Sequence, residues 1–134
     1  MSLAVQLRLA GAALILLALA HVLFPRRFAW REELPRLSQL NRQMFQVHAF
    51  FIALVLLLFG ALSLLLAEEL LAGGRLARAV LIGFVVFWSL RLLTQLFVYD
   101  RSLWQGQRIH TLVHVAFTAF WSWLVTIYAL ALAG

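Results

Sequence analysis

Apolar residues fill four long stretches of this chain, and most charged residues lie between them. The stretches cover residues 3–24, 43–67, 76–99 and 109–132. Each reaches the roughly 20 residues that an α-helix needs to cross the hydrocarbon layer of a membrane. We therefore expect an all-α fold, an integral membrane four-helix bundle of up-down topology that forms a single transmembrane domain.

Breaks in the apolar pattern mark where the expected spans end. The first stretch is closed by "PRR" at residues 25–27, and the second by Glu68 and Glu69. Gly73 and Gly74 follow, and paired glycines are typical of a turn. Because these signals fall between the stretches and not inside them, each stretch is expected to form one helix.

The first stretch also has the features of a secretory signal peptide. Arg8 precedes an apolar run that ends in Ala18-Leu19-Ala20, a small-residue pattern of the kind that signal peptidase cleaves. Cleavage there would leave His21 as a free N-terminus, whose amine and imidazole could together hold copper. We favour a membrane span, because the chain retains the segment from Met1.

The distribution of arginine predicts the orientation of the chain. Short loops rich in Lys or Arg stay in the cytoplasm. The first and third loops are therefore expected to be cytoplasmic, and both termini are expected on the non-cytoplasmic side. Three arginines lie on the opposite side of the membrane: Arg8, Arg75 and Arg78. Seven lie in the first and third loops: Arg26, Arg27, Arg31, Arg36, Arg42, Arg101 and Arg108.

The segment of residues 25–42 combines arginines with Phe28, Trp30, Leu34 and Leu37. Such a mixture is typical of a helix that lies on the lipid headgroups. An ordinary aromatic and basic belt at the membrane surface would explain the same composition equally well.

Composition supports the membrane assignment. The chain is 65% hydrophobic and 12% charged, whereas soluble domains are about half apolar and a quarter charged. Its net charge of +6 could suggest nucleic acid, but the basic residues lie between apolar segments, so membrane lipids are the expected partner and nucleic acid is not. We expect a bacterial cytoplasmic (inner) membrane, and self-association or membership of a larger membrane complex.

Two missing residue types exclude several kinds of chemistry. Without cysteine the chain cannot form a disulfide, a thiolate metal site or a covalent c-type haem attachment. All eleven basic residues are arginine, so no lysine is present to form a Schiff base with a cofactor.

The four histidines are expected at one face of the membrane. His21 ends the first span, His48 begins the second, and His110 and His114 begin the fourth. At 1.5 Å per residue, His48 lies about 10 Å in from Asn41 and His114 lies about 9 Å in from Arg108. The two are thus nearly level, and as the more deeply placed residue of its pair His114 is expected to matter more than His110.

Other polar and aromatic residues share this layer. Arg91 lies inside the third span, where a charged side chain is costly in lipid and is expected to face protein or a polar ligand. Helical spacing places Gln95 on the same face as Arg91, and Trp121 on the same stripe as His114. Asn41 and Arg108 would complete the layer at its outer edge.

These residue types suggest a cofactor. Imidazole binds Fe, Cu and Zn, and two histidines at i and i+4 can reach one ion. A b-type haem between His48 and His114 is the other candidate, since its dianionic ring would neutralise ferrous iron. Its propionates could pair with Arg91, Arg101 and Arg108. The predicted metal ligands are His48, His114, His110 and His21, and the predicted cofactor-binding residues are Arg91, Gln95, Arg108, Asn41 and Trp121.

The leading functional hypothesis is therefore a small membrane redox protein that holds haem or a metal ion at the cytoplasmic side, which as an enzyme would be a membrane-bound oxidoreductase. The alternative is a non-catalytic accessory subunit or a small proton-linked transporter. In that case the His, Gln and Arg layer would pack the helices together or relay protons.

Overall fold

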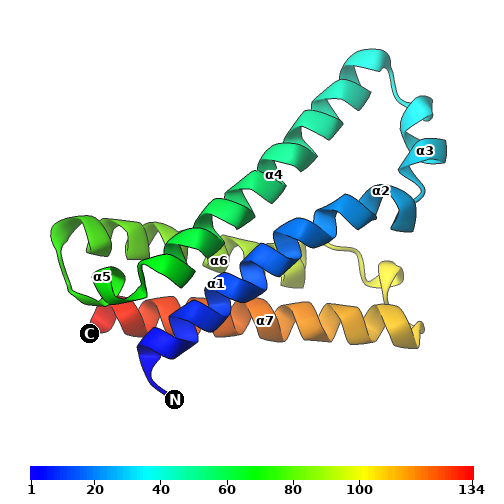
Figure 1. Cartoon of the computed structure of the whole chain (residues 1–134). Helices are drawn as coiled ribbons and strands as arrows, with labels where there is room; N and C mark the ends of the chain where they lie inside the picture. The colour runs from blue at the N-terminus through cyan, green and yellow to red at the C-terminus, as the bar shows by residue number, and fades with distance from the viewer. The chain divides into compact units, whose positions relative to one another are not determined.

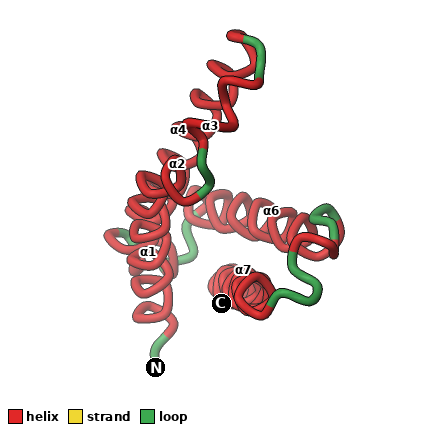
Figure 2. The backbone as a smooth tube through the Cα atoms, turned by 90° about the vertical axis from the view of Figure 1, so that its right-hand side faces the viewer, coloured by secondary structure: helices red, strands yellow, loops and turns green.

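The computed structural model describes residues 1–134, and the chain is helical throughout, with no β-strand. Figure 2 shows that short loops join the helices. Four helical segments are long and apolar enough to cross a membrane: Leu3–Arg27, Gln39–Leu65, Arg75–Phe97 and Arg108–Ala133. The expectation of an all-α chain with four helices long and apolar enough to span a membrane is confirmed.

The chain divides into two compact units. The N-terminal unit comprises Leu7–Ala67, and the C-terminal unit comprises Glu68–Gly134 together with Met1–Gln6. The prediction of one transmembrane domain stays a prediction.

The first span is longer than predicted. Helix α1 (Leu3–Ala20) continues through a 3₁₀ turn, η1 (His21–Leu23), into α2 (Phe24–Arg27). Pro25 does not stop the helix because it lies in the first turn of α2, where a backbone N–H is not needed. The chain instead turns at Ala29, which has a φ of 52° in the left-handed region.

The loop after the first span contains two short helical turns. These are α3 (Trp30–Glu33) and η2 (Leu34–Arg36). The next long helix, α4 (Gln39–Leu65), begins one turn earlier than its apolar pattern predicted. The reason is that the Ser38 hydroxyl caps it by accepting a hydrogen bond from the backbone N–H of Asn41 at 3.3 Å.

Within the N-terminal unit, α1 and α4 meet at two glycines. A Cβ atom built on Gly11 would lie 2.5 Å from the carbonyl oxygen of Gly60, and one on Gly60 would lie 2.7 Å from that of Gly11. Only residues without a side chain allow the two backbones to approach this closely. From this crossing the helices diverge towards α2 and α3 (Figure 1).

The C-terminal unit is built around a helix hairpin. A short helix, α5 (Ala67–Leu71), leads to Gly73, whose φ of 78° makes the predicted turn. Helices α6 (Arg75–Phe97) and α7 (Arg108–Ala133) then run in opposite directions along one another (Figure 1). At one end of the hairpin, Arg78 donates to the carbonyl oxygen of Leu132 at 3.4 Å.

Candidate functional site

Polar side chains meet at the other end of the α6–α7 hairpin. Gln95 lies in the last turn of α6, and His114 lies nearly two turns into α7. Because the helices are antiparallel, the two side chains face each other, with 2.9 Å between Gln95 Nε2 and His114 Nδ1. We call this group, which also includes Arg91, Trp104 and Trp121, the polar cluster.

The Gln95 amide has a defined orientation. Its oxygen, Oε1, accepts hydrogen bonds from Trp121 Nε1 and from Arg91 Nη1, each at 3.4 Å. Both partners are obligatory donors. The amide nitrogen must therefore point to His114, and Gln95 is only 7% exposed, so water cannot easily replace these bonds.

This orientation determines the tautomer of His114. Since the Gln95 amide nitrogen donates, His114 Nδ1 must accept, and the neutral ring carries its proton on Nε2. Neither ring nitrogen then presents a free lone pair. In this arrangement His114 is suited to donating a hydrogen bond and not to binding a metal ion, which requires a lone pair.

The loop between α6 and α7 closes over His114. The Trp104 ring stacks on the imidazole with 4.6 Å between centroids and 8° between planes. The Thr111 hydroxyl donates to the carbonyl oxygen of Trp104 at 2.6 Å, and His110 Nδ1 donates to that of Leu103 at 3.0 Å. Two side chains from the start of α7 thus hold the loop in place.

Asp100 orders the beginning of the same loop. Its carboxylate accepts a hydrogen bond from the backbone N–H of Ser102 at 2.8 Å and caps η3 (Arg101–Leu103). This bond from the backbone of Ser102 lowers the pKa of the Asp100 carboxyl below its usual value. The carboxylate is therefore ionised at neutral pH and lies outside the spanning helices.

Arg91 is held by aromatic rings. Its guanidinium carbon lies 4.8 Å from the centroid of the Trp121 ring and 5.7 Å from that of Tyr99. No acidic side chain pairs with it, and Gln95 is its only hydrogen-bond partner. The cation is thus stabilised by ring faces, while most of its five N–H donors remain available.

Trp121 connects the polar cluster to the apolar part of the hairpin. It stacks on Trp88 of α6 with 5.3 Å between centroids and 9° between planes, and on Phe117 at 5.5 Å. These rings fill the space between the helices directly beside the cluster. Stacked aromatic pairs add stability beyond the area that they bury.

The structure brings together four of the predicted site residues: Arg91, Gln95, His114 and Trp121. It places the remaining five elsewhere. His110 and Arg108 are exposed in the first turn of α7, and His110 turns to the loop carbonyl of Leu103. The other three belong to the N-terminal unit: His21, Asn41 and His48.

The two histidines of the N-terminal unit each bond to their own helix. His21 Nδ1 donates to the carbonyl oxygen of Leu17 at 2.8 Å, and His48 Nδ1 donates to that of Met44 at 2.7 Å. A carbonyl oxygen can only accept, so in the neutral form both rings carry their proton on Nδ1 and a lone pair on Nε2. Within neither unit do three His, Asp or Glu side chains come together as metal ligands would.

Sequence reasoning missed Trp104, which belongs to the polar cluster, and Tyr99, whose ring lies beside Arg91. Both lie beyond the end of α6, where helical periodicity does not predict direction. The dense run of Trp, Arg, Gln, Tyr and Asp in "FWSLRLLTQLFVYDRSLW", residues 87–104, was the available signal.

Comparisons with family models, curated proteins and solved structures give no match for this chain.

Proposed function

We propose that the protein is a non-catalytic accessory subunit of a membrane complex, in which the polar cluster fastens the α6–α7 hairpin. The observation that carries this proposal is the orientation of the Gln95 amide. Its oxygen accepts hydrogen bonds from Trp121 and Arg91, and its nitrogen donates a hydrogen bond to His114 across the hairpin. A buried network whose members satisfy one another is typical of a packing element.

The chemistry of the polar cluster supports a structural role. It contains no carboxylate, and its histidine has no lone pair free to act as a base or a ligand. Arg91 is the exception, because it retains unused donors. In a subunit of a larger assembly these donors would bind an acidic group supplied by a partner helix or by a lipid.

A second candidate is the redox protein with haem b or a His-bound Fe, Cu or Zn ion. The observation in its favour is the tautomer of His21, His48 and His110, each of which donates from Nδ1 to a backbone carbonyl. Metal-binding histidines commonly donate their second ring nitrogen in this way, leaving Nε2 for the ion. As an enzyme the protein would then be a membrane-bound oxidoreductase.

Absorption spectroscopy and metal analysis of the purified protein separate the two candidates. The packing role predicts no Soret band and no stoichiometric metal. A Soret band, or one equivalent of Fe, Cu or Zn, would contradict it and favour the redox candidate.

Histidine variants sharpen the same test. If the cluster is structural, His114→Ala lowers the unfolding temperature in detergent, while His48→Ala and His110→Ala change it little. If the protein holds a cofactor, His114→Ala and His48→Ala each abolish its retention and His110→Ala reduces it partially. Arg91→Ala would then weaken binding without removing a ligand.

We further propose an up-down bundle with both termini outside the cytoplasm, in a bacterial cytoplasmic membrane. The support is the excess of arginine in the first and third loops. Since the chain has no cysteine, one introduced at residue 132 is a unique label. It is expected to react with an impermeant thiol reagent added outside intact cells, and labelling only from the cytoplasm would reverse the orientation.

A further inference from the structure

An open cleft lies between α1 and α4 in the N-terminal unit. Its volume is about 390 Å³, within the range of roughly 300–1,000 Å³ found for small-molecule sites. Its lining residues come after Gly11 in the first span and before Gly60 in α4. Over this part of the chain the two ribbons diverge (Figure 1).

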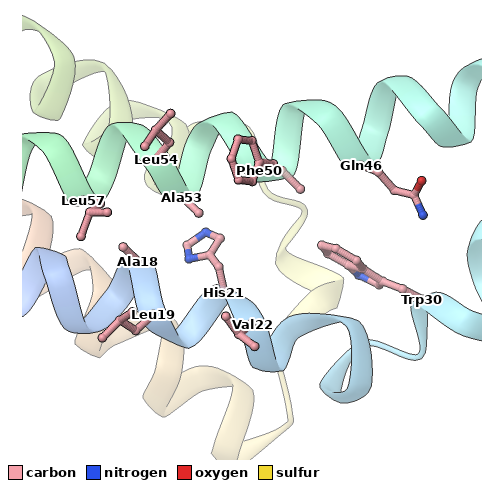
Figure 3. Close-up of a pocket in the computed structure, with 11 residues that line it drawn as sticks. Ala18, Leu19, His21, Val22, Trp30, Gln46, Phe50, Ala53, Leu54 and Leu57 are labelled. Carbon is pink, nitrogen blue, oxygen red and sulfur yellow. The ribbon is translucent and has the colours of Figure 1, made fainter.

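The inner part of the cleft is apolar. Small and branched side chains from both helices line it: Ala18, Leu19, Ala53, Leu54 and Leu57. Figure 3 shows them together on the two facing ribbons. This part fits a hydrocarbon chain.

The outer part of the cleft carries three polar groups. The His21 ring projects from α1's end into the space facing Ala53, and Trp30 and Gln46 lie further out, near each other (Figure 3). From Gln46 to Leu57 the cleft follows twelve residues of α4, whose eleven steps of 1.5 Å give a length of about 16 Å. The site is therefore graded from polar at its mouth to apolar inside.

Each polar group has hydrogen-bonding capacity that no other side chain uses. His21 Nδ1 donates to the carbonyl oxygen of Leu17, which leaves the lone pair of Nε2 as an acceptor. The Trp30 indole N–H and the Gln46 amide make no hydrogen bond within the protein. The cleft therefore offers a ligand two acceptors, His21 Nε2 and the Gln46 amide oxygen, and two donors, the Trp30 indole N–H and the Gln46 amide nitrogen.

The lining also restricts the ligand's charge and shape. No Arg, Asp or Glu lines the cleft, so an ionised phosphate or carboxylate would lack a counter-charge. Trp30, Phe50 and His21 place three aromatic rings in the lining, and aromatic rings favour a planar ring in the ligand. A neutral ring that carries hydroxyl or carbonyl oxygens and a short apolar chain meets each condition.

We propose that this cleft binds a lipid-soluble ring compound of the quinol and quinone class. The ring lies at the mouth, a hydroxyl of the quinol form donates to His21 Nε2, and the chain extends between α1 and α4 towards Leu57. The proposal concerns binding alone and is independent of the role of the polar cluster.

Binding of decylubiquinol and of its oxidised form to the full-length protein in nanodiscs tests the proposal, with quenching of tryptophan fluorescence as the readout. The quinol is expected to bind more tightly than the quinone, because only the quinol has a hydroxyl to donate to His21 Nε2. Ala53→Phe fills the cleft and is expected to weaken both at least tenfold. Leu58→Phe, on an exposed position of the same helix, is the matched control and should bind as wild type does.

A second pair of variants tests the hydrogen bond between the ligand's ring and His21. His21→Phe keeps a ring but removes the acceptor, so it should reduce quinol affinity about fivefold and quinone affinity little. His21→Gln supplies an acceptor oxygen and should restore part of the difference. Circular dichroism checks that each variant is folded.

Three results would overturn the proposal. They are absence of binding to the wild-type protein, equal binding by Ala53→Phe, and equal competition by dodecanol. The last would show that the cleft accepts any apolar chain, such as a lipid tail, without selecting a ring.

Discussion

The two helix pairs of this protein are joined in different ways. Helices α6 and α7 are linked by side chains, through the stack of Trp88 on Trp121 and the hydrogen bond between Gln95 and His114. Helices α1 and α4 are linked by backbone contact at Gly11 and Gly60. In lipid, apolar surface alone does not hold helices together, so close packing or hydrogen bonding has to do so. The N-terminal unit uses close packing, and the C-terminal unit uses hydrogen bonding and ring stacking.

The consequence of this difference is the shape of each pair. The hairpin is connected at both ends, by Arg78 to the carbonyl of Leu132 and by Gln95 to His114. The α1–α4 pair is in backbone contact at one point and is next bridged by Trp30, whose ring meets Phe45 edge-on at 4.9 Å. The cleft lies between these two contacts.

Gly60→Leu should produce the largest effect, because it breaks the glycine contact. A Cβ atom there would lie 2.7 Å from the Gly11 carbonyl oxygen and 2.8 Å from Ile15 Cγ1, so the helices must separate. We expect a loss of about 3 kcal/mol in the free energy of unfolding, measured by denaturant titration in detergent.

The control for this substitution is Gly83→Ala in α6. Nothing lies within 4 Å of the added Cβ atom, and alanine has the higher helix propensity, so stability should rise slightly. Equal stability of Gly60→Leu and wild type would show that the close contact between α1 and α4 contributes nothing.

Gln95→Leu tests the side-chain hydrogen bonds that join α6 and α7, and it should have the second largest effect. It leaves His114 Nδ1 and the Trp121 indole without their partner. A buried polar group without a partner costs roughly 1–3 kcal/mol, and we expect a loss of about 2 kcal/mol in the same titration.

Gln43→Leu is the matched control for Gln95→Leu. Gln43 is exposed on α4 and makes no hydrogen bond through its side chain, so its replacement should be nearly neutral. If both glutamine variants were equally stable, the polar cluster would not fasten the hairpin.

Asp100→Asn should have the smallest effect and tests whether the loop contributes through charge. The hydrogen bond from Ser102 lowers the pKa of Asp100 in the folded chain. Its contribution to stability is therefore present above the unfolded pKa and is lost as the pH falls through the lower, folded value, in a window below about pH 4.

Asparagine keeps a cap on η3 but does not titrate, so the variant should lose the part of the pH dependence that lies in this window. The measurement is the unfolding temperature of both proteins between pH 2 and 7. Identical profiles would assign no role to the Asp100 charge.

Much of the fold could be predicted from the sequence. Four apolar stretches separated by charges, prolines and glycines specify four helices, because the requirement is only length and composition. The predicted ends of the helices were less accurate. The first span continues to Arg27 through Pro25, and α4 starts at Gln39 because Ser38 caps it, and both are local effects that apolar periodicity does not report.

The sequence by itself also determined that polar residues lie at one end of α6 and α7, since helical spacing places Arg91 and Gln95, and His114 and Trp121, on common stripes. Only the tertiary structure decided which groups meet and which of them donates. A face can be predicted from one helix, but the tautomer of His114 depends on an amide from another helix, whose direction depends in turn on Trp121 and Arg91. The cleft has the same origin, because a space between helices is a property of how two backbones diverge and not of either sequence alone.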